Sequence, residues 1–253
     1  MCVAAVAWNA HPDWQLVAIG NRDEFHQRPA APLARWDDPE GVIAGRDLQS
    51  GGTWLGVTEA GRFVLVTNLR GYGAPDPSRR SRGELVTGLL AGKHDGDDLQ
   101  QYNPFNIIEI SGSQARFLTN RPEDTAANLP HGIYGLSNGR LDEPWAKTLQ
   151  SKGAMLDWLG EEDSGFAPLF DVLADDSLDA FGTQPITPSD VAIEPSETPP
   201  FIRHSLYGTR CSTVVTVDRE GIGRIVERRF DASGRPTGET EIGFGWPRIG
   251  AWP

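Results

Sequence analysis

Cysteine and closely spaced histidine are scarce in this sequence. Cys2 and Cys211 are the only cysteines among 253 residues, too few for a disulfide framework. No Cys/His cluster has the spacing of a zinc site, and the five histidines lack the i, i+4 pairing of helical metal sites. We therefore predict no metal site and a reducing environment.

Basic residues are also in deficit. The chain has 23 lysines and arginines against 35 acidic residues, and its formal net charge is −12. Nucleic-acid binding normally requires a basic face that neutralises phosphates, so the composition argues against a nucleic-acid partner. The same acidity argues against docking on an anionic membrane.

Long apolar runs are absent from the sequence. No stretch approaches the roughly 18 apolar residues of a membrane-spanning helix, so we expect no membrane insertion. The first residues lack the basic region and the small-residue cleavage site of a signal peptide. A soluble, cytoplasmic protein is therefore expected.

Glycine and proline are plentiful, with 29 and 19 residues, which favours turns and β structure. The apolar segment Cys2–Trp8, a turn at 11–13 and the apolar segment Leu16–Ile19 predict an antiparallel β-hairpin. Further strands are predicted at Trp54–Val57, Phe63–Thr67, Asn106–Ile110, Ala115–Leu118, Gly132–Asn138, Thr213–Val217, Arg224–Phe230 and Thr240–Phe244.

Helical patterns occur in the middle of the chain. Ser81 and Glu84 have the spacing of a capping box and predict a helix from about 82 to 91. Asp142 is the predicted N-cap of a second helix, with Pro144 at its first position. We predict that this second helix runs to Leu149 and resumes after Gly153 as far as Leu159. A further helix is predicted at Phe166–Leu173, and a surface loop at Thr183–Pro200.

The order of these elements indicates the fold class. Strands dominate both ends of the chain and helices lie between them, which is typical of an α+β layered fold and not of alternating βαβ units. No internal repeat or convincing linker divides the sequence. We therefore predict a single domain over residues 1–253.

Cys2 is the first candidate for chemistry. If Met1 is removed, Cys2 carries a thiol and an α-amine, which together supply a nucleophile and its general base. The amine has a reference pKa of about 7.7 to 8.0, so part of it is neutral at physiological pH and can accept the thiol proton. The alternative is a small buried core residue, which is a common position for free cysteine.

Four polar residues, Asn21-Arg22-Asp23-Glu24, follow the second predicted strand directly. Antiparallel pairing with the first strand would bring them beside Cys2. A charged group at the end of a buried strand is costly unless its members pair or serve a pocket. The alternative is a solvated turn with an ordinary ion pair.

Asn68 and Asn138 each end a predicted strand. Asparagine is a frequent turn former, and this is the plain interpretation. Its side-chain amide is also a good donor to the oxyanion that develops during acyl transfer. Neither interpretation is excluded by the sequence.

The polar run is one of several segments in which this sequence resembles the NRDE family, which includes the Transport and Golgi organisation proteins of eukaryotes. The resemblance covers essentially the whole chain and rests on seven segments in the family's order. These are Met1-Cys2, Asn21-Arg22-Asp23-Glu24-Phe25 with Arg28-Pro29, Gly51-Gly52-Thr53-Trp54-Leu55-Gly56, Thr67-Asn68, Arg82-Gly83-Glu84-Leu85-Val86, Tyr134-Gly135-Leu136-Ser137-Asn138 with Pro144-Trp145, and Gly208-Thr209-Arg210.

The resemblance implies a four-layer αββα sandwich of antiparallel sheets, related to the cysteine N-terminal-nucleophile hydrolases. In that group Cys2 would be the nucleophile. These hydrolases usually place their Arg and Asp three residues apart, whereas here Arg22 is followed directly by Asp23 and Glu24. Either acid is therefore a candidate to contact the amine. The catalytic set implied by position is Cys2, Arg22, Asp23, Asn68, Asn138 and Arg210. The predicted substrate-binding set is Asn21, Glu24, Trp54 and Arg70.

Two classes of function follow from this resemblance. The first is a cysteine amidohydrolase that cleaves a linear amide of a small molecule and needs no cofactor. The second is a carrier that uses the same pocket for haem or for a lipid or acyl-CoA. Haem would need an axial His, Cys or Tyr ligand. The phosphates of an acyl-CoA would need cations such as Arg79, Arg80 and Arg82.

Overall fold

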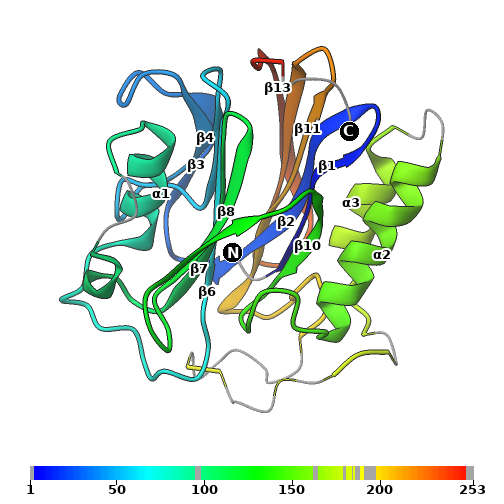
Figure 1. Ribbon diagram of the computed structural model, residues 1–253. Helices are drawn as coiled ribbons and strands as arrows, with labels where there is room; N and C mark the ends of the chain where they lie inside the picture. Colours follow the sequence, from blue (N-terminus) through cyan, green and yellow to red (C-terminus); the bar gives the residue numbers. More distant parts are fainter. Residues whose placement is uncertain are drawn as a thin grey trace.

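Two antiparallel β-sheets stack face to face between layers of helix in the computed structural model (Figure 1). The structure describes residues 3–94, 98–161, 165–178, 181–183, 185, 189–190 and 198–248. Cys2 and most of the predicted loop at 183–200 lie outside the described residues. Among the described residues, no helix has the length and apolar character needed to cross a membrane.

The first sheet has six strands and contains the predicted N-terminal hairpin. Val3 pairs with Asn21 and Trp8 with Leu16 in antiparallel register, so this prediction is confirmed. The second strand does not stop at Ile19, because it continues through the polar run to Phe25. In spatial order the strands are β10 (Gly132–Leu136), β1 (Val3–His11), β2 (Trp14–Phe25), β11 (Tyr207–Asp218), β12 (Ile222–Phe230) and β13 (Pro236–Gly245).

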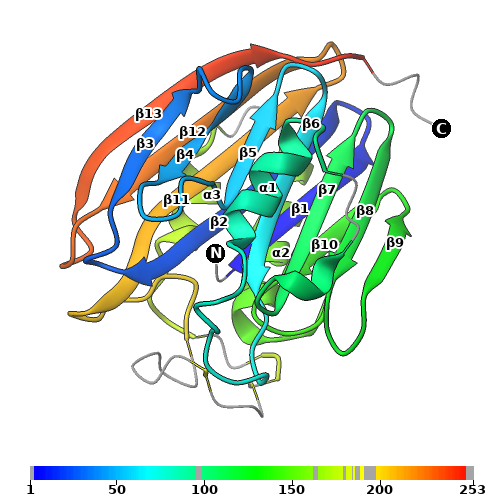
Figure 2. The same cartoon turned by 90° about the vertical axis from the view of Figure 1, so that its left-hand side faces the viewer.

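The second sheet has seven strands that follow one another in chain order (Figure 2). Three of them were not predicted. β9 has four exposed residues out of five and lacks an apolar face, while β3 contains Pro32 and only one buried residue. The strands are β3 (Ala30–Arg35), β4 (Val42–Asp47), β5 (Leu55–Thr58), β6 (Arg62–Asn68), β7 (Phe105–Ser111), β8 (Gln114–Thr119) and β9 (Thr125–Leu129).

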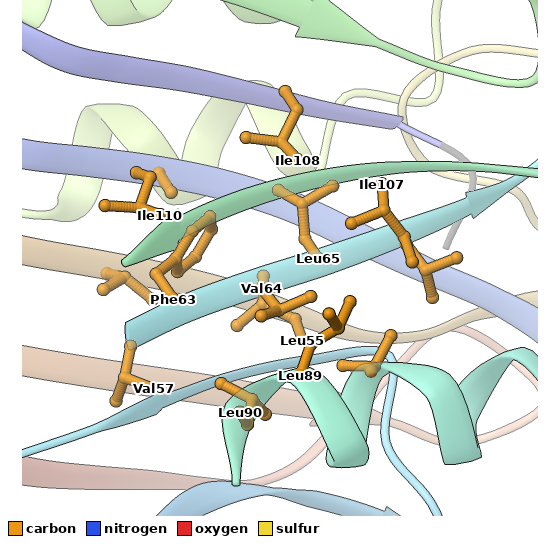
Figure 3. Close-up of a cluster of buried hydrophobic side chains, with 14 of the residues drawn as sticks. Leu55, Val57, Phe63, Val64, Leu65, Leu89, Leu90, Ile107, Ile108 and Ile110 are labelled. Atoms are coloured by element: carbon orange, nitrogen blue, oxygen red, sulfur yellow. The ribbon is translucent and has the colours of Figure 1, made fainter. Parts of the chain in front are cut away.

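Helix α1 (Arg82–Leu90) covers the outer face of the seven-stranded sheet. Leu89 and Leu90 point from it toward β5 and β6, and this apolar contact fixes the helix (Figure 3). The Ser81 hydroxyl accepts a hydrogen bond from the Gly83 N–H at 3.2 Å, as expected of an N-cap. Glu84 pairs with Arg80 instead of completing the predicted capping box.

Helices α2 (Ala146–Gly160) and α3 (Ala167–Leu173) cover the outer face of the six-stranded sheet (Figure 1). Asp142 is not the N-cap of α2: it lies four residues before the helix and accepts a hydrogen bond from the Gly135 N–H. The predicted break at Gly153 is also wrong, because α2 is continuous. The short 3₁₀ helix Leu99–Gln101 lies between α1 and β7.

β1 is buried on both faces of the six-stranded sheet from Val3 to Asn9, which explains why it is apolar from Val3 to Trp8. Ala4 and Val6 pack between the two sheets, while Ala5 and Ala7 pack under α2 and α3. The layers therefore run α1, seven-stranded sheet, six-stranded sheet, α2 with α3. The predicted four-layer αββα sandwich of antiparallel sheets is confirmed.

Two glycines test the packing of this sandwich with the same substitution. A Cβ at Gly52 would lie 2.2 Å from the backbone carbon of Gly83, whereas a Cβ at Gly153 meets nothing within 4 Å. We expect Gly52→Ala to destabilise the fold by about 1–3 kcal/mol because it pushes α1 away from the sheet. Gly153→Ala should stabilise α2 by about 0.5–1 kcal/mol. Urea unfolding measures both, and equal effects would contradict the described contact.

Candidate functional site

The polar run Asn21–Glu24 lies within β2, so its side chains alternate between the two faces of the sheet. Arg22 and Glu24 point into the space between the sheets. There the Arg22 guanidinium lies over the ring of Trp54, just before β5, and forms an ion pair with Asp47 at the end of β4. Asn21 points the other way, toward α3. The run is therefore not one polar cluster, because it serves two separate environments.

Asn21 is fully buried on the helix side. Its Nδ2 donates to the carbonyls of Leu173 and Pro200 at 2.7 and 2.8 Å, and its Oδ1 accepts from the Ser212 hydroxyl at 2.6 Å. These bonds engage the Asn21 amide within the interior and tie β2 to β11 and to the helix layer. The expectation that Asn21 binds substrate stays a prediction.

Asp23 is also buried, with 3% of its surface exposed. Its Oδ1 accepts a hydrogen bond from the Thr209 hydroxyl at 2.6 Å. The same hydroxyl oxygen accepts from the Ile202 N–H at 2.9 Å, so Asp23 is oriented by a short chain of hydrogen bonds. A buried carboxylate held in this way is suited to binding a neighbouring cation such as an α-ammonium group.

Arg22 is the most unusual side chain between the sheets. It is only 4% exposed, and its guanidinium lies 4.4 Å from the centre of the Trp54 ring. Its Nη2 is 3.8 Å from Glu24 Oε2 and 3.6 Å from Asp47 Oδ2, which are ion-pair distances too long for hydrogen bonds. Its buried Nη1 has no hydrogen-bond partner among the described residues. This guanidinium therefore retains donor capacity.

A network of ion pairs surrounds Arg22. Arg28 donates from Nε to Asp47 Oδ2 at 2.8 Å, and its Nη2 lies 2.7 Å from the same oxygen. Asp47 Oδ1 accepts the backbone N–H of Gln49 at 2.9 Å, which fixes its carboxylate. Glu24 lies 3.7 Å from Arg28. Arg28 and Asp47 were not among the predicted site residues, although Arg28 lies just beyond the polar run.

A cavity of about 390 Å³ opens beside this network, and we call it the arginine cavity. Five arginines and three acidic residues occur in its lining, so the lining is formally cationic in a chain of net charge −12. Such a site attracts anions. Its charged or polar lining comprises Arg22, Glu24, Arg28, Asp47, Gln49, Ser50, Thr53, Asn68, Asp76, Arg79, Arg80, Ser81, Arg82 and Asn103, with Trp54 and Val66 among the remaining residues.

Asn68 lines the arginine cavity, but Asn138 and Arg70 line a smaller neighbouring one. Asn138 Nδ2 donates to the Asn68 carbonyl at 3.0 Å, and its Oδ1 lies 3.3 Å from the buried ammonium of Lys147. These contacts fix the Asn138 amide. The structure thus brings Asn68 and Asn138 together, and their predicted roles toward an oxyanion stay predictions.

Arg210 is the extra residue of a β-bulge in β11, because Thr209 pairs with Asp23 and Cys211 with Arg22. Its Nη1 donates to the carbonyls of Phe25 and Arg28 at 2.8 and 2.9 Å. Burial, and then the charge of Arg22, lower the pKa of Arg210. The side chain braces the end of β2 and does not line the arginine cavity.

Glu227 is a buried acid that the sequence did not single out. It is 2% exposed, lies on β12, and accepts a hydrogen bond from the Leu33 N–H of β3 at 2.9 Å, so it joins the two sheets. Burial raises its pKa. Burial, followed by the charge of Glu227, also raises the pKa of the Cys211 thiol well above its ordinary value. The one signal in the sequence that could have singled out Glu227 is its place at an inward-facing position of a strand with alternating burial.

Cys2 lies outside the described residues. Its neighbour Val3 is the first residue of β1 and pairs with Asn21, so the chain enters the sheet beside the polar run. The predicted antiparallel arrangement of the first two strands therefore holds as far as the described residues extend.

The architecture and the site define a class: an αββα sandwich with a cationic cavity lined by residues of both sheets. The chain belongs to the Transport and Golgi organisation 2 family, whose model matches residues 1–232. The predicted NRDE-family membership is thus confirmed.

Curated relatives match most of the chain. The Transport and Golgi organization 2 homolog of Mus musculus is 31% identical, covering 90% of this chain and 92% of the relative. The Homo sapiens homolog is 32% identical over the same shares. Among solved structures, the Caenorhabditis elegans N-acylethanolamine-hydrolyzing acid amidase ortholog matches with a TM-score of 0.47 and 12% identity, covering 84% and 92% of the two chains. At that level the likeness carries no weight for function.

Removing the Asn21 amide should test its structural role. Asn21→Ala leaves two buried carbonyls and the Ser212 hydroxyl without this partner, so we expect a loss of about 3 kcal/mol or more in the free energy of unfolding. Ser212→Ala removes one of the three bonds and should cost about 1–3 kcal/mol. Chemical denaturation measures both. A cost below about 1 kcal/mol for Asn21→Ala would refute this assignment.

Glu227 should make stability depend on pH. Because folding raises its pKa, the unfolded chain releases this proton at a lower pH than the folded chain does. Its contribution to stability should therefore fall as pH rises above the unfolded value of about 4.3, and level off above the folded pKa. Glu227→Gln keeps an acceptor for Leu33 and removes the titration. The free energy of unfolding of Glu227→Gln, relative to that of the wild type, should increase between pH 4 and 8. A relative value that does not change with pH would contradict the raised pKa of Glu227.

Proposed function

We propose that this protein is an N-terminal cysteine amidohydrolase that cleaves a linear amide of a small molecule. The observation that carries the proposal is the pairing of Val3 with Asn21. Cys2 is joined to Val3 by one peptide bond, and Arg22 and Asp23 are the next two residues along the partner strand. The end of β1 that leads to the proposed nucleophile therefore lies beside two buried charged groups of β2, Arg22 on the face between the sheets and Asp23 on the helix face.

The chemistry needs only the chain's own groups once Met1 is removed. The Cys2 amine accepts the thiol proton, and the thiolate attacks the amide carbon to form a tetrahedral oxyanion. Collapse breaks the C–N bond, and the amine's proton leaves with the departing nitrogen. Water, deprotonated by the same amine, then hydrolyses the thioester and releases a carboxylic acid.

Three described residues support distinct roles in this scheme. The buried Arg22 Nη1 is available to donate to the thiolate or to the substrate carbonyl. Asp23 is held by Thr209 in an orientation suited to an ammonium group, which favours it over Glu24, whose Oε1 accepts from the Phe25 N–H. Asn68 lines the arginine cavity and supplies an amide.

The two cysteines make a direct test. Cys211 is buried and its thiol pKa is raised, so it should resist alkylation in the folded protein. We expect the intact mass to show removal of Met1, and iodoacetamide at pH 7 to label one site, Cys2. Cys211→Ala should label like the wild type and Cys2→Ala should not label.

The outcome that would contradict the hydrolase is a retained Met1, because the α-amine that serves as the base would then not exist. A wild type in which Cys2 is not labelled would equally contradict the proposed nucleophile, because its thiol would then be neither accessible nor activated. A panel of N-acyl amides, assayed by release of free amine, then identifies the substrate. Cys2→Ala should lose at least about 10³-fold in turnover.

A carrier role is the second candidate, favoured by one observation. Arg79, Arg80 and Arg82 line the arginine cavity together with Arg22 and Arg28, and phosphates of an acyl-CoA would suit this lining. For haem the support is weaker, because the cavity's lining among the described residues contains no His, Cys or Tyr. Titration with a fluorescent acyl-CoA and with haemin separates these ligands. Saturable binding by Cys2→Ala without any turnover by the wild type would favour the carrier.

A further inference from the structure

The loop after β6 wraps its backbone around a carboxylate. Gly71 N–H and Tyr72 N–H donate to Asp190 Oδ2 at 2.8 and 3.3 Å, and Gly73 N–H donates to Asp190 Oδ1 at 3.0 Å. Gly71 and Gly73 have φ values of +91° and +89°, which favour glycine. Three successive N–H groups that converge on one anion form a backbone nest, an arrangement that binds carboxylates and phosphates.

Two arginines occur beside this nest. Arg70 and Arg82 line the same small cavity as Gly73 and Asp190. With the Asp190 carboxylate seated, the cavity retains only about 30 Å³, and all three N–H groups of the nest already donate to Asp190. Another anion can therefore enter the nest only by displacing Asp190.

The nest cavity adjoins the arginine cavity, since the two share part of their lining. Both are lined by Asn68, Pro75, Arg82 and Asn103, so a ligand that reaches Arg22 in one lies next to the other. Arg22 provides an independent indication of a ligand, because it is 4% exposed and its Nη1 has no hydrogen-bond partner among the described residues. The two cavities together offer one extended cationic surface.

We propose that the Gly71–Gly73 nest, with Arg70 and Arg82, is a subsite for an oxyanion of the ligand, and that Asp190 is the chain's own competitor for it. The ligand then carries a carboxylate or phosphate at the end remote from Arg22. Its identity as the substrate of the amidohydrolase rests on the proposed function. Anion binding by the nest does not, because it needs neither Cys2 nor turnover.

Competition has a measurable consequence. An internal carboxylate that occupies the nest most of the time lowers the apparent affinity of an external anion by the fraction of time that the nest is open. Removing that carboxylate should restore the intrinsic affinity. The negative charge that repels the incoming anion is removed as well, so a control must separate these two effects.

The test is an amide-resolved NMR titration with inorganic phosphate and, separately, with acetate. In Asp190→Ala we expect saturable shifts of the Gly71, Tyr72 and Gly73 amides and an affinity at least about tenfold above that of the wild type for one of the anions. Tighter binding of phosphate or of acetate identifies the preferred group. Asp157→Ala is the control: it lies exposed on α2, changes the net charge equally, and should bind like the wild type.

Three results would overturn the proposal. They are equal anion affinity in Asp190→Ala and the wild type, equal gains in Asp190→Ala and Asp157→Ala, and shifts confined to amides outside 71–73. If Asp190→Ala does not fold, Asp190→Asn replaces it, because the amide keeps one acceptor for the nest and should give an intermediate affinity. In Asp190→Ala, adding Arg70→Met should weaken anion binding again.

Discussion

The central position of β2, paired on one edge with β1 and on the other with β11, constrains the rest of the site. A strand held on both edges cannot rotate its side chains away from the sheet normal. Arg22 and Glu24 are therefore forced between the sheets, and Asn21 and Asp23 are forced toward the helices. The bulge at Arg210 shifts the register between β2 and β11 by one residue within the polar run, between the Asp23–Thr209 and Arg22–Cys211 pairs.

Burying Arg22 imposes a second constraint, because a guanidinium removed from water needs compensation. The Trp54 ring lies 4.4 Å from it, and the acids Glu24 and Asp47 lie at ion-pair distance. Glu24 and Asp47 also bind Arg28, so the negative charge is shared between two arginines. The result is a preorganised cation at the inner end of a cavity in an otherwise acidic protein, an arrangement that concentrates the field for an anionic ligand.

The sequence predicts those parts of this arrangement that depend on local pattern. The hairpin and α1 with its buried leucines follow from apolar periodicity and turn residues, whereas the order of the four layers was implied only by the family resemblance. The division of Asn21–Glu24 between two faces was missed because the polar residues were taken to end the strand, whereas pairing with β11 extends it. Asp47 and Glu227 were missed for a related reason: the strand that ends at Asp47, β4, was not predicted, and Glu227 occupies an inward position that ordinarily indicates an apolar residue. The faces of Asn21–Glu24 and the positions of Asp47 and Glu227 all depend on pairing between distant strands, which no local pattern encodes.

Cys211 shows what the fold does to a thiol next to Arg22. It pairs with Arg22 across β2 and β11, and that positive charge on its own would lower the pKa of the thiol. Burial and the charge of Glu227 nevertheless raise the pKa well above the ordinary value, so proximity to the guanidinium does not suffice to produce a thiolate. A reactive cysteine at this end of the sheet therefore needs what Cys211 lacks, namely access to solvent and a base of its own. Under the proposed function both requirements fall on Cys2, which would supply the amine once Met1 is removed, and Arg22 would then stabilise a charge that another group creates.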